Sequence, residues 1–345
     1  MINVQGYDHY ERCIDGGRGE FADRIKSGEY KNKSLLIFNA GEAELSPYLS
    51  YYDIGKLVGH YTEITGCTRE DGQSDHFDPH PYNVEIVSWP YYWLMKTVTT
   101  IFTEGEEIRH GMLEELSGAN APRSLYTCMM RQPKPMRKML FDVLEKESLL
   151  PDGIVTCAWK GLSIDLKEQA PEDGKWFMNS DWELIQQTHR FPPWYTNCLI
   201  DIIPETHYDK LFYTEKTWKA ILGRRVPLIC GARRSNHALA DMGFKTPEWL
   251  DVYWDGEHHE YDRVLGLGET LKTLRETGGT DPLHIRGAWS GWKKMSIDNQ
   301  IRALEILLEY GKPPHNDPNI LKEYTFAVEI SEYLMDYFYA LYEKI

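Results

Sequence analysis

Leu211-Phe212-Tyr213-Thr214-Glu215-Lys216-Thr217-Trp218-Lys219-Ala220-Ile221-Leu222-Gly223 runs on, after two arginines, into Val226-Pro227-Leu228-Ile229-Cys230-Gly231. The first stretch predicts a short helix that begins beside an acid and a lysine and stops at a glycine, and the second predicts a buried strand. An acid followed directly by a lysine at a helix N-terminus suits a sugar nucleotide. The carboxylate can accept hydrogen bonds from ribose hydroxyls, and the ammonium group can meet a diphosphate, which the helix dipole and free N–H groups also favour.

The same alternation of strand and helix extends through residues 121–250. Near-continuous apolar runs predict strands at 124–129, 154–159, 198–203 and 226–230, and periodic patterns predict helices at 136–146, 216–222 and 235–242. Such runs are typical of a parallel sheet that helices cover on both faces. We therefore expect an α/β domain over residues 121–315.

Less regular patterns precede and follow this region. Strands are predicted at 34–39 and 84–87, a helix from Ser46 through Leu57, and a polar loop from Thr65 to Tyr82. The aromatic cluster Trp89–Trp93 follows a strand, where it serves either as a wall for an acceptor or as packing between domains. Because 345 residues are many for one core, we expect a separate N-terminal domain over 1–120. Long helices are predicted from Ser296 to Tyr310 and from Pro318 to Ile345, and the segment 316–345 is expected to pack back on the body.

Composition excludes several classes of protein. The net charge of −15 argues against a nucleic-acid binder that works through bulk positive charge. Six cysteines without a Cys-x-x-Cys pair predict reduced thiols in a cytoplasmic protein. The N-terminus lacks the apolar core of a signal peptide, and no apolar run is long enough to span a membrane. Neither Gly-x-Gly-x-x-Gly nor a P-loop is present, which disfavours dinucleotide and P-loop enzymes.

A metal site is not expected. His76 and His80 stand near Asp75 and Asp78 in the polar loop, but loops gather such residues for turns and solubility. We therefore predict no metal and no cofactor.

The stretch Phe212–Lys219, together with Arg225-Val226-Pro227-Leu228-Ile229-Cys230-Gly231, resembles the donor-site motif of the α1,3-fucosyltransferase family. That motif has a Thr/Ser-Glu-Lys triplet, a short helix and a Val-Pro strand that ends in Gly. The chain is also similar to viral and bacterial glycosyltransferase-like proteins, which continue with a helix and a turn like Gly243-Phe244-Lys245-Thr246 and carry a helix-borne arginine that Arg137 matches. The resemblance spans residues 124–250. The basic Gly223-Arg224-Arg225 departs from the small residues of fucosyltransferases, which leaves the base and the sugar of the donor open.

The resemblance implies two Rossmann-like domains that face a cleft, the GT-B arrangement, with C-terminal helices packing across. It implies an inverting, metal-independent transfer from a nucleotide sugar bound by the C-terminal domain. The candidate donor-binding residues are Arg137, Arg131, Tyr195, Asn197, Glu205, Thr214, Glu215 and Lys216. Without a metal, cationic side chains and a helix N-terminus must neutralise the leaving diphosphate.

Each of these residues also has a structural interpretation. Lys216 is either a diphosphate ligand or a solvated lysine, although a lysine in the first turn opposes the helix dipole. Glu215 either holds the ribose or is simply a favourable first-turn acid, and Thr214 is a natural N-cap. Arg137 either neutralises phosphate or lies on the surface of its helix, and Glu205 is either a ligand group or a loop acid.

An inverting transfer also needs a general base for the acceptor hydroxyl, most simply a carboxylate of the N-terminal domain. Glu42, Asp78 and Glu85 are the candidates. The leading hypothesis is a glycosyltransferase that acts on a glycan or small-molecule acceptor. One alternative is a viral enzyme that glycosylates a hydroxymethylated base in DNA, with Arg224, Arg225, Arg233 and Arg234 gripping the backbone. The other is a binding protein that keeps the donor site without turnover.

Overall fold

The structure is a computed structural model of the 345-residue chain, and it describes residues 2–5, 27, 33–38, 61–68, 84–88, 91–102, 122–130, 133–162, 197–205, 208, 211–313 and 318–344. The described residues have a mixed α/β fold with two four-stranded parallel sheets. The chain divides into two compact units, Met1–Tyr92 with Gly311–Tyr324, and Trp93–Tyr310 with Thr325–Ile345. The boundary predicted at residue 120 lies further along the chain than the first of these divisions.

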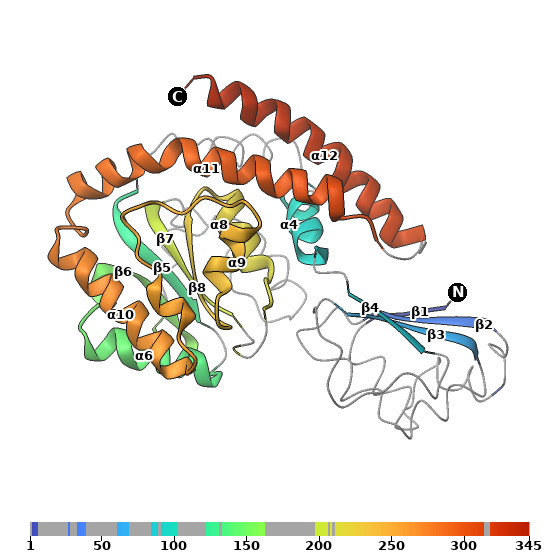
Figure 1. The fold of residues 1–345 in the computed structure, drawn as a ribbon, viewed down its shortest axis with the longest axis horizontal. Helices are drawn as coiled ribbons and strands as arrows, with labels where there is room; N and C mark the ends of the chain where they lie inside the picture. Colours follow the sequence, from blue (N-terminus) through green and yellow to red (C-terminus); the bar gives the residue numbers. More distant parts are fainter. Residues whose placement is uncertain are drawn as a thin grey trace. The chain divides into compact units, whose positions relative to one another are not determined.

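The first unit contains a sheet of β1 (Ile2–Gln5), β2 (Lys33–Phe38), β3 (Tyr61–Thr68) and β4 (Val84–Ser88), in that order (Figure 1). The predicted strands at 34–39 and 84–87 are confirmed. The loop predicted from Thr65 is wrong over 65–68, because the aromatic and β-branched residues Tyr61, Thr62, Ile64 and Thr65 favour a strand. The rest of that loop and the helix predicted from Ser46 lie outside the described residues.

The second unit contains β5 (Ser124–Met130), β6 (Gly153–Cys157), β7 (Cys198–Pro204) and β8 (Val226–Cys230). Their order is β6-β5-β7-β8, and all pairs are parallel, as predicted. The chain leaves β5 towards one side of the sheet and leaves β7 towards the other. Open parallel sheets bind ligands at such a switch of direction, outside the carboxyl ends of the two central strands.

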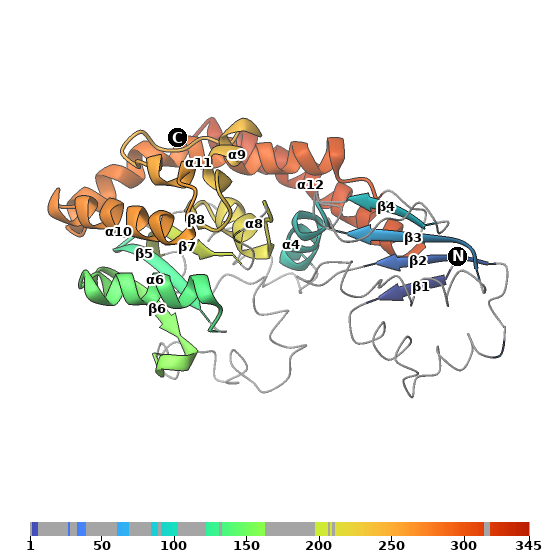
Figure 2. The same cartoon turned by 60° about the horizontal axis from the view of Figure 1, so that its bottom comes forward.

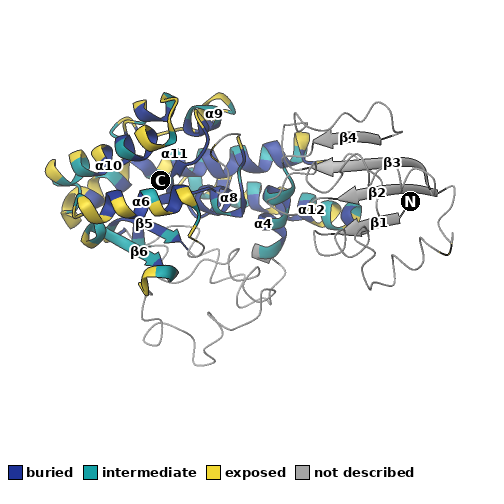
Figure 3. Ribbon diagram, turned by 90° about the horizontal axis from the view of Figure 1, so that it is seen from below, coloured by how far each residue is buried: buried dark blue, intermediate teal, exposed yellow. Residues whose placement is uncertain are grey.

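Helices cover both faces of this sheet (Figures 1 and 2). Right-handed crossovers in opposite directions place α6 (Pro135–Lys146) and α8 (Glu215–Leu222) on opposite faces. The helix α6 packs against α10 (Glu260–Glu276), whereas α8 packs against α11 (Pro282–Tyr310). Figure 3 shows α8 mostly in the buried colour, since it lies between the strands and α11.

Among the described residues, the helices α4 (Tyr92–Phe102) and α10 were not predicted, and α11 begins earlier than the predicted helix at 296. Glycines weaken the helical signal of α10. A Cβ on Gly266 would lie 2.1 Å from the Cβ of Trp254, and one on Gly268 would lie 2.5 Å from Cγ1 of Val143. These glycines therefore allow α10 to pack closely at the cost of helix propensity.

The C-terminal helix α12 (Pro318–Tyr342) ends close to the predicted boundary. Its residues from Thr325 onward belong to the second unit, where Lys294 Nζ of α11 lies 4.2 Å from the ring centroid of Tyr342. Ile320, Ala327, Leu334 and Phe338 are buried, as their spacing predicts. Within the described ranges, no helix has both the length and the apolar content needed to cross a membrane.

Candidate functional site

The candidate site lies at the carboxyl edge of the second sheet, between β5 and β7. The register sets Met130 level with Cys157 and Pro204 level with Cys230, so all four strands end at this edge. The first turn of α6 follows β5, and α8 follows β7 after residue 214. Side chains far apart in sequence, from α6, from the end of β7 and from α8, meet at this switch point.

Arg137 enters this edge from the first turn of α6. Only 5 % of the residue is exposed, and its Nε donates to the carbonyl oxygen of Pro204 at 3.3 Å. Among the residues that the structure describes, no carboxylate forms an ion pair with it, and no hydrogen bond from its two terminal nitrogens is seen. A largely buried guanidinium without a carboxylate partner is a strong anion-binding group.

Glu205, directly after β7, caps α8. Its carboxylate accepts from the backbone N–H of Thr214 at 2.9 Å, from the Thr214 hydroxyl at 2.9 Å and from the Thr217 hydroxyl at 2.8 Å. Burial raises the pKa of Glu205, against the lowering effects of Lys216 and of the hydrogen bonds from Thr214 and Thr217. These bonds make Glu205 part of the frame of the site, because both of its carboxylate oxygens already accept hydrogen bonds within the protein.

Thr214 is the N-cap of α8, as predicted. Its hydroxyl accepts from the backbone N–H of Lys216 at 3.3 Å. The backbone N–H groups of Thr214 and Lys216, which the sequence suggested as phosphate ligands, therefore already donate to Glu205 and Thr214. The carboxylate of Glu205 also sits at the positive end of the helix dipole, where it reduces the attraction for another anion.

Glu215 and Lys216 form an ion pair with each other, at 2.7 Å between Nζ and Oε1. The Lys216 side chain is 21 % exposed and that of Glu215 is 8 % exposed. One turn later, burial lowers the pKa of Lys219 to about 8, although Asp201 and Glu215 raise it. The first turns of α8 therefore carry acidic and basic side chains close together. Of the two lysines, Lys216 is the more exposed.

Asn197 is not part of this site, contrary to prediction. It precedes β7, and its carbonyl accepts from the N–H of Arg123 at 2.7 Å, ahead of β5. Both residues lie at the amino ends of parallel strands, which is the edge opposite Arg137. Tyr195 and Arg131 lie outside the described residues.

The predicted general bases are not tested by the described residues. Glu42 and Asp78 lie outside the described ranges. Glu85 lies within β4 beside Thr65 of β3, and its side chain is not among those described. The possible ligands His76, His80, Asp75 and Asp78 also fall outside, and the described part of the chain holds no cluster of three metal-binding side chains.

Arg224 and Arg225 are fully buried, so the prediction that they grip a DNA backbone is wrong. Both guanidinium groups pack on the ring of Trp289, at 5.2 and 4.8 Å from its centroid. Arg224 also donates to Ser296 Oγ at 3.0 Å, and Arg225 donates to the carbonyl oxygens of Gly223 and Cys198. The two arginines anchor α11 to the end of α8, which their sequence position could not reveal. Arg233 and Arg234 are exposed.

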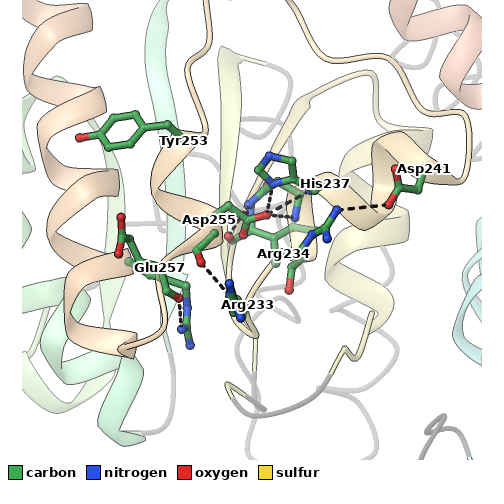
Figure 4. A network of polar contacts seen from close by, with 12 residues as sticks. Arg233, Arg234, His237, Asp241, Tyr253, Asp255 and Glu257 are labelled. Carbon is green, nitrogen blue, oxygen red and sulfur yellow. Dashed lines mark hydrogen bonds and ion pairs between the residues drawn. The ribbon is translucent and has the colours of Figure 1, made fainter.

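A second polar network lies at the same edge and was not predicted (Figure 4). Asp255 is buried in η6 (Tyr253–Gly256) and accepts from the backbone N–H groups of Asn236 at 2.8 Å and His237 at 3.1 Å, at the start of α9 (Ser235–Asp241). His237 Nδ1 lies 2.9 Å from the same carboxylate. The acid and the histidine are 18 residues apart, and no local pattern links them.

Comparison of the chain with protein-family models, curated proteins and solved structures returned no significant match.

Proposed function

We propose that this chain is a glycosyltransferase that moves a sugar from a nucleotide-sugar donor to a hydroxyl acceptor. The observation that carries the proposal is Arg137, a buried guanidinium at the switch point with its terminal nitrogens free of carboxylate partners among the described residues. A departing nucleoside diphosphate carries the negative charge that such a group stabilises. Lys216 supplies a second cation at the start of α8.

The architecture proposed with this function is the GT-B arrangement, with two Rossmann-like domains and the donor in the second. Two parallel sheets, one in each compact unit, support this proposal. The order β6-β5-β7-β8 supports a nucleotide at the carboxyl ends of β5 and β7. The transfer is proposed to invert the anomeric centre and to need no metal, so it should continue in the presence of EDTA.

Calorimetry with UDP, GDP, CDP and ADP tests the donor site. Arg137→Gln is expected to weaken binding of the preferred diphosphate about 10- to 100-fold, because a hydrogen bond to a charged group contributes about 1.5–3 kcal/mol. Arg302→Gln is the matched control. Its Nε also donates to a backbone carbonyl, that of Met242 at 2.8 Å, but its guanidinium pairs with Glu305. Unchanged affinity in Arg137→Gln would remove the proposed site.

Release of the nucleoside diphosphate from the matching nucleotide sugar then separates an enzyme from a binding protein. A glycosyltransferase transfers the sugar to an acceptor, or slowly to water, and so liberates diphosphate. A non-catalytic protein binds the donor and releases none. Addition of duplex DNA carrying hydroxymethylated bases tests the DNA-modifying alternative, whose binding would weaken steeply with salt.

A further inference from the structure

The pair His237–Asp255 has the geometry of a proton acceptor held by a carboxylate. Asp255 is almost fully buried, whereas 42 % of the His237 side chain is exposed. Besides the two backbone N–H groups and the imidazole, the carboxylate of Asp255 accepts from Asn236 Nδ2 at 3.0 Å. These donors hold Asp255 in one orientation, so the imidazole meets a fixed acceptor.

A fixed carboxylate selects the tautomer of the ring beside it. In neutral His237, Nδ1–H donates to Asp255, so Nε2 carries the lone pair on the opposite side of the ring. Within the described residues, no hydrogen bond engages Nε2 of His237. An oriented imidazole with an exposed basic nitrogen is the common form of a general base.

The location of His237 connects it to the donor site. The hydroxyl of Tyr213, the residue before the N-cap of α8, donates to the carbonyl oxygen of Ser235 at 2.8 Å. Ser235 begins α9, and His237 lies in the same turn. The starts of α8 and α9 therefore adjoin at the carboxyl edge. Among the described residues, the charged side chains labelled around His237 in Figure 4 are Arg233, Arg234, Asp241, Asp255 and Glu257, and Arg234 lies 3.9 Å from Asp241.

Building on the proposed function, we propose that His237 is the general base of the transfer, with Asp255 as its positioning residue. Nε2 of His237 takes the proton of the acceptor hydroxyl while that oxygen bonds to the anomeric carbon of the donor. The bond from this carbon to the diphosphate oxygen breaks, and the nucleoside diphosphate leaves with the electron pair. The proton then passes from His237 to solvent. The acceptor is an alcohol or, in its absence, water.

Binding and proximity are tested on the unmodified chain. Calorimetry first identifies which of UDP, GDP, CDP or ADP binds, and ¹⁵N-imidazole NMR then follows the histidines during addition of that diphosphate. The signal of His237 should shift, and that of His284 should not. His284 is a matched reference because its Nδ1 also has a fixed partner, the carbonyl oxygen of Gly278 at 2.8 Å, in the turn before α11. Binding that leaves His237 unmoved would overturn the general-base role and leave the donor site standing.

Turnover is tested with His237→Gln and His284→Gln, measured as diphosphate released from the matching nucleotide sugar. His237→Gln should lower kcat about 10²- to 10⁴-fold, which is the usual contribution of general base catalysis, while the affinity for the diphosphate stays within about twofold. His284→Gln should match the wild type. Equal kcat in His237→Gln and wild type would refute the role of His237. A chain that binds no diphosphate, or releases none from any donor, would overturn this role together with the transferase.

Discussion

Glu205→Ala tests whether this carboxylate belongs to the frame of the site or to its ligand contacts. The substitution removes the acceptor of one backbone N–H and two hydroxyls at the start of α8. Hydrogen bonds to a charged group contribute about 1.5–3 kcal/mol each. The two threonine hydroxyls can rotate towards other acceptors, and the cost of burying the charge, which the raised pKa of Glu205 reflects, offsets part of the gain. We therefore expect a loss of about 3–5 kcal/mol in the free energy of unfolding.

Glu205→Gln keeps the shape of the side chain and one carbonyl oxygen, so it should cost about half as much. Urea unfolding followed by tryptophan fluorescence measures both variants, with an unchanged m-value as the sign that only stability differs. Glu257→Ala removes an exposed acid near the same edge and should stay within about 0.5 kcal/mol of the wild type. A loss below about 1 kcal/mol in Glu205→Ala would refute the capping role.

The same pair of variants also decides between the two interpretations of Glu205. If this carboxylate contacted the ligand, Glu205→Gln would weaken nucleotide binding strongly with little effect on stability. The observed bonds predict the reverse, namely a clear loss of stability and a diphosphate affinity within a few-fold of the wild type.

Lys219→Met should alter how stability depends on pH. Burial lowers the pKa of Lys219 from 10.5 to about 8, so between pH 8 and pH 10.5 the native state holds fewer protons than the unfolded chain. This lysine therefore makes the free energy of unfolding rise by about 3 kcal/mol as the pH rises across that window. The effect of Lys219 is the free energy of unfolding of the wild type minus that of the variant at each pH. This subtraction is needed because the thiols of Cys198 and Cys230, whose pKa values burial raises to about 12, lower the stability of both proteins as the pH rises above 9. A difference that does not change with pH would contradict the assignment. Gly266→Ala should lower the melting temperature despite the better helix propensity of alanine, because the added methyl group would lie 2.1 Å from the Cβ of Trp254. A higher melting temperature would show that α10 can move away from Trp254. Arg225→Met should cost about 2–4 kcal/mol in chemical unfolding, because it leaves two buried carbonyl oxygens without their donor. An unchanged midpoint of unfolding would contradict the anchoring role of Arg225.

The second unit was largely predictable from sequence because its strands carry their signal locally. The runs at 124–129, 198–203 and 226–230 are apolar throughout, and such runs form buried parallel strands whatever their partners. The order of the strands and the switch between β5 and β7 were not predicted, because pairing depends on contacts between distant segments. The helix α10 was missed because Gly266 and Gly268 serve packing rather than helix propensity.

The residues of the candidate site were also predictable only in part. Arg137 and Thr214 were predicted from their places beside a strand end and a helix start, and both lie at the edge of the sheet where such positions converge. The charge pattern alone could not show that Arg225 turns inward onto Trp289. Asn197 was assigned to the wrong edge, because it precedes the strand predicted at 198–203, and the amino end of a parallel strand lies opposite the carboxyl edge.

Two of the helices that start at the carboxyl edge of the second sheet, α8 and α9, are capped in the same manner. Glu205 holds the start of α8, and Asp255 holds the start of α9. A buried carboxylate at a helix N-terminus uses N–H groups and opposes the dipole, so neither terminus attracts an anion as a bare helix end would. Binding of a diphosphate at the starts of α8 and α9 must therefore depend on cationic side chains. Lys216 would have to give up its ion pair with Glu215 to engage a phosphate, whereas Arg137 has no carboxylate to leave among the described residues. It follows that Arg137→Gln should weaken diphosphate binding more than Lys216→Ala, and the opposite order would mean that the helix start, rather than the guanidinium, forms the anion site.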